Sequence, residues 1–143
     1  MNILITGHEG FFGHALIGRL KSSENFIVGL DQDLDLKNEL KNTPDVVTRG
    51  DVSNYNLVRR VIADYEIDEI YHLASKAIVK TTSSDPFTTY QTNVMGTVAL
   101  LEACKNSGQK VKSIVISTSD KAFGESKVPY NEDSSLKPLY SYD

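Results

Sequence analysis

The sequence predicts an α/β fold in which helices cover both faces of a doubly wound parallel sheet of about five strands. Short apolar runs alternate along the chain with longer segments of helical periodicity, which is typical of repeated β-α-β units. A glycine turn, Gly7-His8-Glu9-Gly10-Phe11-Phe12-Gly13, separates the first apolar run from the first helical segment. An acidic residue, Asp31, follows the second apolar run. This order indicates a sheet that binds a ligand at the carboxyl ends of its strands.

The N-terminal half of the chain contains three of the expected strands. Residues 11–21 carry apolar side chains at a helical spacing and predict the first helix. Residues 33–44 are charged and end in a proline, which predicts a loop or a short helix. The three strands are expected in short apolar runs: 2–6, 26–30 and 46–48.

Two further helices and two further strands are expected in the rest of the chain. Residues 54–65 form an amphipathic pattern that Ser53 or Asn54 can cap. A long helix is predicted over 85–106, with Pro86 in its tolerated first turn. After Lys121 the chain is polar and no element is clear. The strands are expected at 69–73 and 111–117.

Composition narrows the classes of function. The chain has 143 residues, a net charge of −4 and 40% hydrophobic residues, so nothing predicts nucleic acid or an anionic membrane as a partner. No apolar run is long enough for a membrane span and the N-terminus lacks signal-peptide features, so we expect a cytoplasmic protein. The single cysteine, Cys104, is expected to be a buried structural thiol, and no residue cluster predicts a metal site.

The glycine turn predicts a Rossmann-type site for the pyrophosphate of a dinucleotide. Gly7 permits a tight turn, Gly10 lets the backbone approach the phosphates, and Gly13 lets the helix pack close to the strand. The helix then presents backbone N–H groups to the phosphates, Phe11 and Phe12 among them.

Asp31 predicts which dinucleotide binds. A carboxylate at the end of the second strand can accept hydrogen bonds from the adenosine ribose hydroxyls, and it repels the 2′-phosphate of NADP. We therefore expect NAD as the cofactor. Glu9 is unexpected inside a phosphate-binding turn, and its carboxylate must point away from the phosphates.

The GxxGxxG spacing resembles that of the extended short-chain dehydrogenase/reductase superfamily, and further segments match the family's motifs in order. Gly50-Asp51-Val52 resembles its adenine-side motif, which implies that Asp51 faces the exocyclic amine. Tyr71-His72-Leu73-Ala74-Ser75 resembles a strand end that lines the middle of the cofactor, and residues 92–97 resemble the family's N-V-x-G-T helix. The resemblance thus implies these further cofactor contacts: Val52, Leu73, Ala74, Ser75 and Asn93.

The segment Ser119-Asp120-Lys121 narrows the resemblance to NAD-dependent nucleotide-sugar dehydratases. It is similar to the corresponding segment of CDP-glucose 4,6-dehydratases. This similarity implies that the Ser119 hydroxyl lies at the sugar, that Asp120 is the general acid and that Lys121 is the base. Water elimination needs such an acid and base, and we expect burial beside the cofactor to set their protonation states. Epimerases usually lack this pair, so a 4-epimerase acting on UDP-hexoses is the second interpretation. For the segment itself, the alternative is a polar turn after the strand.

Residues 139–143 resemble the approach to the family's Y-x-x-x-K motif. Tyr142 aligns best with its catalytic tyrosine and Tyr140 is the second choice; the lysine would then lie beyond Asp143. We therefore expect residues 1–143 to be an NAD-binding domain that is truncated before the last strands and the substrate domain. The resemblance also implies a nucleotide-sugar substrate.

Two expectations concern the chain as it stands. A homo-oligomer can form through the 85–106 helix or through the edge of the fifth strand, which would be exposed. Without the lysine, the chain can also be a dinucleotide-binding module without catalysis. Lys76 and Lys80 come after the fourth strand and are interpreted as solvated loop residues, with contact to a substrate phosphate as the alternative.

Overall fold

A computed structural model describes residues 1–32 and 42–143, apart from the side chains of residues 79–81. The strands are β1 (Asn2–Thr6), β2 (Phe26–Asp31), β3 (Val46–Arg49), β4 (Glu69–His72) and β5 (Ser113–Ile116). The α-helices are α1 (Phe11–Leu20), α2 (Tyr55–Asp64), α3 (Val79–Ser84), α4 (Pro86–Tyr90) and α5 (Gly96–Asn106). A π-helical turn (Gln91–Met95) joins α4 to α5, and a 3-10 helix (Asp120–Phe123) comes after β5.

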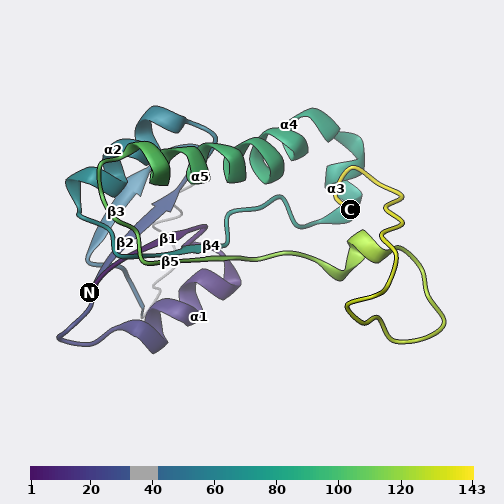
Figure 1. Cartoon of the computed structure of the whole chain (residues 1–143), viewed down its shortest axis with the longest axis horizontal. Coiled ribbons are helices and arrows are strands. Elements are labelled where there is room, and N and C mark those ends of the chain that lie inside the picture. Colours follow the sequence, from purple (N-terminus) through teal and green to yellow (C-terminus); the bar gives the residue numbers. More distant parts are fainter. Residues whose placement is uncertain (33–41) are drawn as a thin grey trace.

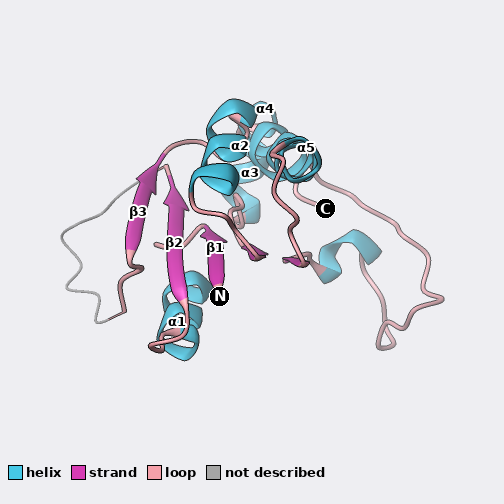
Figure 2. Cartoon of the chain, turned by 60° about the vertical axis from the view of Figure 1, so that its left-hand side comes forward, coloured by secondary structure: helices cyan, strands magenta, loops and turns pink. Residues whose placement is uncertain are grey.

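The five strands are parallel and lie in the order β3-β2-β1-β4-β5. Helix α1 lies on one face of the sheet, and α2 and α5 lie on the other (Figures 1 and 2). The predicted doubly wound Rossmann-type fold is therefore confirmed. The strand order reverses between β1 and its neighbour β4, so the loops after these two strands diverge and leave a crevice where a ligand can bind.

The central strand β1 is buried on both faces, which explains its continuous apolar sequence. Ile3 and Ile5 pack with Ile17 of α1 in one core. Leu4 belongs to the second core, beneath α2 and α5. The other buried side chains of this second core come from the strands, from α2 and α5, and from the segments that connect them: Val28, Leu30, Val52, Val58, Val61, Ile62, Ile67, Ile70, Leu100 and Ala103.

The segment predicted as one helix over 85–106 is divided into three. The Asp85 carboxylate caps α4 by accepting from the Thr88 N–H at 3.1 Å, and Pro86 occupies the first turn as predicted. The π-helical turn then widens the helix before Gly96. Gly96 lies against Val52, whose Cγ1 would be 2.6 Å from an added Cβ, so the lack of a side chain lets the start of α5 approach the segment after β3.

Several element boundaries differ from the predicted ones. Helix α2 begins after Asn54, whose side chain accepts from the Leu57 N–H at 3.1 Å, so Asn54 rather than Ser53 is the cap. Helix α3 and the 3-10 helix were not predicted from the sequence. The loop or short helix expected over 33–44 falls mostly on residues 33–41, which lie outside the described residues.

Strand β5 is shorter than the predicted 111–117 and pairs with β4 alone among the described strands. Its side chains are half-buried or exposed, because no helix of the described chain covers it on the α1 side. Cys104 is half-buried, and burial raises the pKa of its thiol to about 11. It therefore fits the predicted structural thiol, although it is less buried than expected. None of the described helices combines the length and apolarity that a membrane crossing requires.

The buried position of Leu4 leads to a stability prediction. Leu4→Ala removes a fully buried side chain between β1 and the α2/α5 layer, so we expect it to lower the free energy of unfolding by about 2–5 kcal/mol. Val115→Ala on the half-exposed edge strand is the matched control and should change it by less than about 1 kcal/mol. Urea denaturation followed by circular dichroism measures both; equal losses would contradict the assignment of β1 to the centre of the core.

Candidate active site

The glycine turn after β1 is built from close backbone contacts. The Gly7 N–H donates to the Leu30 carbonyl at 2.9 Å, and Gly7 has a φ of 71°, a conformation that favours glycine. A Cβ at Gly7 would lie 2.7 Å from the Ala74 nitrogen, and one at Gly13 would lie 2.4 Å from the Gly7 carbonyl oxygen. Both neighbours are backbone atoms, so neither position has room for a side chain.

Helix α1 begins at this turn, beside the carboxyl end of β1. Its N-cap is Gly10, which provides no side-chain capping bond, so the helix end is suited to an anionic group. Phe11 and Phe12 extend their rings outward, 86% and 73% exposed, with an edge-to-face contact at 5.6 Å between ring centroids. Their predicted contribution to cofactor binding can therefore come from their backbone rather than from their rings.

Asp31 lies at the carboxyl end of β2 beside the glycine turn. Its Oδ2 accepts from the Glu9 N–H at 3.1 Å, which ties β2 to the turn. The Glu9 carboxylate lies 3.2 Å from Nε2 of the buried His8, so it turns toward the protein, as expected of a carboxylate in a phosphate-binding turn. Asp31 and Glu9 line a cavity of about 300 Å³ with these residues: Gly7, Gly10, Leu30, Gln32, Gly50, Val52, Leu73, Ala74, Ser75, Lys76 and Thr92.

Two predictions on this cavity need refinement. Asp51 is absent from the described residues that line it, although Gly50 and Val52 on either side do line it, and the Asp51 Oδ1 accepts from the Ser53 N–H at 2.8 Å. Its role toward an adenine therefore stays a prediction. Lys76 lines the cavity, so it is not simply a solvated loop residue. The side chain of Lys80 lies outside the description.

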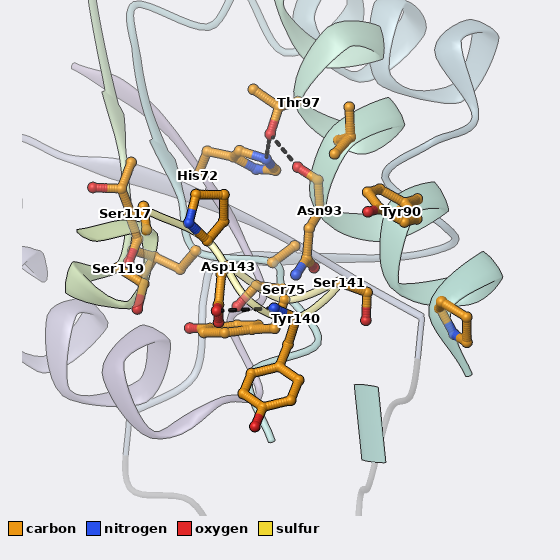
Figure 3. Close-up of a pocket in the computed structure, with 18 of the residues that line it drawn as sticks. His72, Ser75, Tyr90, Asn93, Thr97, Ser117, Ser119, Tyr140, Ser141 and Asp143 are labelled. Atoms are coloured by element: carbon orange, nitrogen blue, oxygen red, sulfur yellow. Dashed lines mark hydrogen bonds between the residues drawn. The ribbon is translucent and has the colours of Figure 1, made fainter. Parts of the chain in front are cut away.

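A larger cavity of about 830 Å³ lies on the other side of the loop after β4 (Figure 3). The loop supplies one wall, the α4–α5 helices a second, the segment after β5 a third, and the C-terminal residues 138–143 the last. Leu73, Ala74 and Ser75 line both cavities. The two cavities are thus separated by a single short loop at the reversal of strand order, where a dinucleotide spans the sheet in this fold.

The larger cavity brings together two of the four predicted catalytic residues. Ser119 and Tyr142 both line it, and Tyr140, the second choice, does so as well. The Ser119 Oγ accepts from the Lys121 N–H at 3.2 Å and thereby caps the 3-10 helix. In a 3-10 helix side chains three residues apart share a face, so Ser119 and Ala122 face the cavity together.

Asp120 and Lys121 lie outside the described lining of the cavity, and both are exposed. The deep burial that we expected to set their protonation states is therefore missing in the chain as it stands. The physical reason is the 3-10 turn, which directs Asp120 and Lys121 away from the face that Ser119 and Ala122 present. Their roles as acid and base are not tested by this geometry and stay predictions.

Hydrogen bonds to α3 and within the segment itself hold the C-terminal residues against the cavity. The Ser141 Oγ donates to the Thr82 carbonyl of α3 at 3.0 Å, and the Asp143 carboxylate accepts from the N–H groups of Leu139 and Tyr140 at 2.8 and 3.0 Å. Figure 1 shows this segment returning beside α3. The sequence contained the tyrosines but no signal that the segment folds back.

A buried histidine, His72, was missed as a site residue by the sequence analysis. It lies at the end of β4, 3% exposed, with Nδ1 2.7 Å from Thr6 Oγ1 and Nε2 3.1 Å from Thr97 Oγ1. Burial lowers the pKa of its imidazole from 6.5 to about 4, so the ring is neutral at pH 7. The only sequence signal was a histidine at the last position of a buried strand.

Comparisons with known proteins agree with this geometry. A family model described as GDP-mannose 4,6 dehydratase matches residues 4–143. UDP-glucose 4-epimerase from Neisseria meningitidis is 33% identical over 94% of this chain and 42% of its own length, and CDP-glucose 4,6-dehydratase from Salmonella typhimurium is 32% identical over 85% and 35%. The chain thus spans less than half the length of these relatives.

Solved structures show the same similarity in three dimensions. UDP-glucose 4-epimerase from Thermotoga maritima, solved with UDP-glucose, superimposes with a TM-score of 0.88 at 27% identity, over 99% of this chain and 46% of that one. The Thermus thermophilus enzyme, in complex with NAD, gives 0.83 at 27% identity, over 99% and 46%. Fold and site define a nicotinamide-dinucleotide-binding domain of the extended short-chain dehydrogenase/reductase class. Within it, the chain belongs to the NAD-dependent epimerase/dehydratase family to which the GDP-mannose 4,6 dehydratase model is assigned.

The neutral His72 leads to a prediction on pH. Its pKa is about 4 in the folded chain and about 6.5 in the unfolded chain, so only the unfolded chain takes up a proton between these values. Stability is therefore fully present above pH 6.5 and falls by about 3 kcal/mol as the pH drops to 4. Urea denaturation at several pH values measures this, and His72→Gln should flatten the curve in that window; an unchanged slope would contradict the assignment.

The contacts of Gly13 predict a position-specific cost. Gly13→Ala places a methyl group against the backbone of Gly7 and His8, so we expect a loss of at least about 2 kcal/mol of unfolding free energy. The control is Gly18→Ala in the same helix, where the added Cβ meets only the side chain of Asn42. Better helix propensity should make that variant neutral or stabilising. Thermal unfolding compares the two variants. Equal stability of both would contradict the close backbone contact at Gly13.

Proposed function

We propose that this chain holds NAD across the loop formed by Leu73, Ala74 and Ser75. The observation that carries the proposal is that one loop lines both cavities at the carboxyl ends of the strands. The α1 N-terminus and the glycine turn would hold the pyrophosphate. Asp31 would accept from the adenosine ribose hydroxyls in the smaller cavity, and the nicotinamide end would lie beside Ser119 in the larger one.

The substrate we propose is a nucleotide sugar whose hexose enters the larger cavity. When bound, the nicotinamide takes a hydride from C4 of the hexose and later returns it. The Tyr142 phenolate would accept the proton of the C4 hydroxyl, and the Ser119 hydroxyl would hold its oxygen by a hydrogen bond. The two side chains support this assignment because they line the same cavity, from segments that are separate in the sequence.

The reaction we propose for the complete protein is 4,6-dehydration. After oxidation at C4, a base removes the C5 proton and an acid protonates the departing 6-hydroxyl, so that water leaves; the hydride is then returned at C6 and the proton at C5. Lys121 would serve as base and Asp120 as acid, once substrate and further chain bury them. The match of residues 4–143 to a 4,6-dehydratase family model supports this reaction.

The second candidate is 4-epimerisation, which needs Ser119 and Tyr142 but no acid at the 6-hydroxyl. Two observations favour it: Asp120 and Lys121 lie outside the cavity lining, and UDP-glucose 4-epimerases superimpose closely on the chain. A dinucleotide-binding module without catalysis is the third. Hydride transfer at C4 is common to the first two candidates, so these two reactions differ only in their later steps.

We also propose that two copies associate through the α4–α5 helices. The apolar side chains Phe87, Tyr90, Val94, Val98 and Leu101 recur every three or four residues and are all exposed. One helical row of this kind can pack against the same row of a second copy. Light scattering should report a dimer, and Val98→Lys with Leu101→Lys should give a monomer; a monomer in the parent chain at high concentration would count against it.

Cofactor binding is tested by calorimetric titration of the chain with NAD and NADP. We expect NAD to bind and NADP to bind more weakly, because the Asp31 carboxylate repels a 2′-phosphate. Asp31→Asn should weaken NAD binding roughly tenfold, as expected for a hydrogen bond to a charged group, and should narrow the preference over NADP. Asp64→Asn, at the end of α2 and outside both cavity linings, should change neither value. Equal binding of both dinucleotides would overturn the assignment of Asp31.

The reaction is tested with the protein expressed from its complete reading frame. Incubation with UDP-glucose and CDP-glucose should give a 4-keto-6-deoxy sugar for dehydration and the C4 epimer for epimerisation. Tyr142→Phe should lower kcat by about 10² to 10⁴ for either reaction. Asp120→Asn should block elimination only if the protein is a dehydratase, with exposed Asp133→Asn as control. NAD binding without either product would support the third candidate.

A further inference from the structure

A chain of hydrogen bonds with defined directions passes through His72. The Thr97 hydroxyl lies 2.9 Å from the Asn93 carbonyl, which can only accept, so Thr97 Oγ1 donates there. Its remaining lone pairs accept from His72, so Nε2 carries the ring proton. Nδ1 is then an acceptor, and Thr6 Oγ1 donates to it at 2.7 Å (Figure 3 shows the Thr97 end).

Both ends of this chain reach the loop that lines the two cavities. At one end, Thr6 Oγ1 accepts from the Ala74 N–H at 3.3 Å. At the other end, the chain stops at the main-chain carbonyl of Asn93, and the side-chain amide of the same residue accepts from the Lys76 N–H at 2.8 Å and donates to the Lys76 carbonyl at 3.2 Å. The loop is therefore tied to β1 at Ala74 and to the π-helical turn at Lys76, and His72 lies between Thr6 and Thr97, the hydroxyls next to the two attachments.

We propose that His72, as the neutral Nε2–H tautomer, is a positioning residue that sets the loop 73–76 and thereby the wall shared by the two cavities. Each hydroxyl in the chain both donates and accepts, so a change at one end leaves a donor or acceptor unsatisfied at the other. This differs from a purely local packing role, in which loss of one hydroxyl would affect only its nearest neighbours. The consequence for NAD rests on the proposed function; the tautomer and the loop do not.

The test uses the whole chain and begins without any cofactor. Long-range ¹H–¹⁵N NMR reports which ring nitrogen of His72 carries the proton, with His72→Gln identifying the signal. We expect Nε2–H in the parent chain. Hydrogen exchange of the Ala74 amide reports the far end of the chain. Thr97→Val keeps the shape of the side chain but removes the hydroxyl; it should mix the tautomers and speed Ala74 exchange roughly tenfold.

Two controls separate coupling from general destabilisation. Thr97→Ser restores the hydroxyl and should restore both signals. Thr89→Val makes the same change at a buried threonine about two turns earlier, outside the chain of hydrogen bonds, and should leave both signals as in the parent. If Thr97→Val fails to fold, the pair Thr6→Val and Thr6→Ser replaces it, with exchange of the Lys76 amide as the far-end signal.

An Nδ1–H tautomer or a charged ring at pH 7 would overturn the proposal. A folded Thr97→Val variant in which the exchange rate of the Ala74 amide is unchanged would also overturn it. A final titration adds NAD: where the parent chain binds it, Thr97→Val should weaken binding roughly tenfold and Thr89→Val should not. No NAD binding by the parent chain would refute the proposed function alone, since the tautomer and exchange results are obtained without cofactor. If Thr97→Val speeds Ala74 exchange but binds NAD as tightly as the parent chain, the link between His72 and the cavities is refuted.

Discussion

The close approach of the Gly7 turn to the loop after β4 is the constraint on which the site depends. A Cβ at Gly7 would lie 2.7 Å from the Ala74 nitrogen, so the two backbones meet with no side chain between them. This contact occurs where the strand order reverses, and it places the glycine turn and the loop side by side at the crevice. The two cavities then open on either side of that loop.

The same contact explains why a polar network lies at the buried ends of β1 and β4. The loop after β4 must expose its backbone to a ligand and so cannot be held by strand pairing alone. Thr6 and His72 hold it instead, from the last positions of β1 and β4. Burying such groups is costly unless all are satisfied, and here each hydroxyl and each ring nitrogen of the network has a partner.

The chain carries the part of the site that is common to several reactions of its family. The glycine turn, Asp31 and the loop after β4, which would hold the dinucleotide in the proposed binding mode, line one cavity at the carboxyl ends of β1, β2 and β4. Ser119 and Tyr142 reach the larger cavity from the segment after β5 and from the last residues. The step that separates dehydration from epimerisation is proposed to use Asp120 and Lys121, which lie outside the lining of the cavity. Relatives with both activities are accordingly similar to this chain.

Local pattern was sufficient for the strands, the helices α1 and α2, and the glycine turn, because each depends on periodicity, on a cap such as Asn54 or on residues that permit a tight turn. The resemblance also singled out Ser119 and Tyr142 by motif, and both line the larger cavity. Local pattern could not show the π-helical turn, the exposure of Asp120 and Lys121, or the hydrogen bonds of His72. Such features depend on contacts between residues distant in sequence: Thr6 with His72, His72 with Thr97, and Ser141 with Thr82. The sequence by itself thus determined the fold and the class of cofactor. Only the tertiary structure decided which side chains share a cavity, because that depends on where separate strands end.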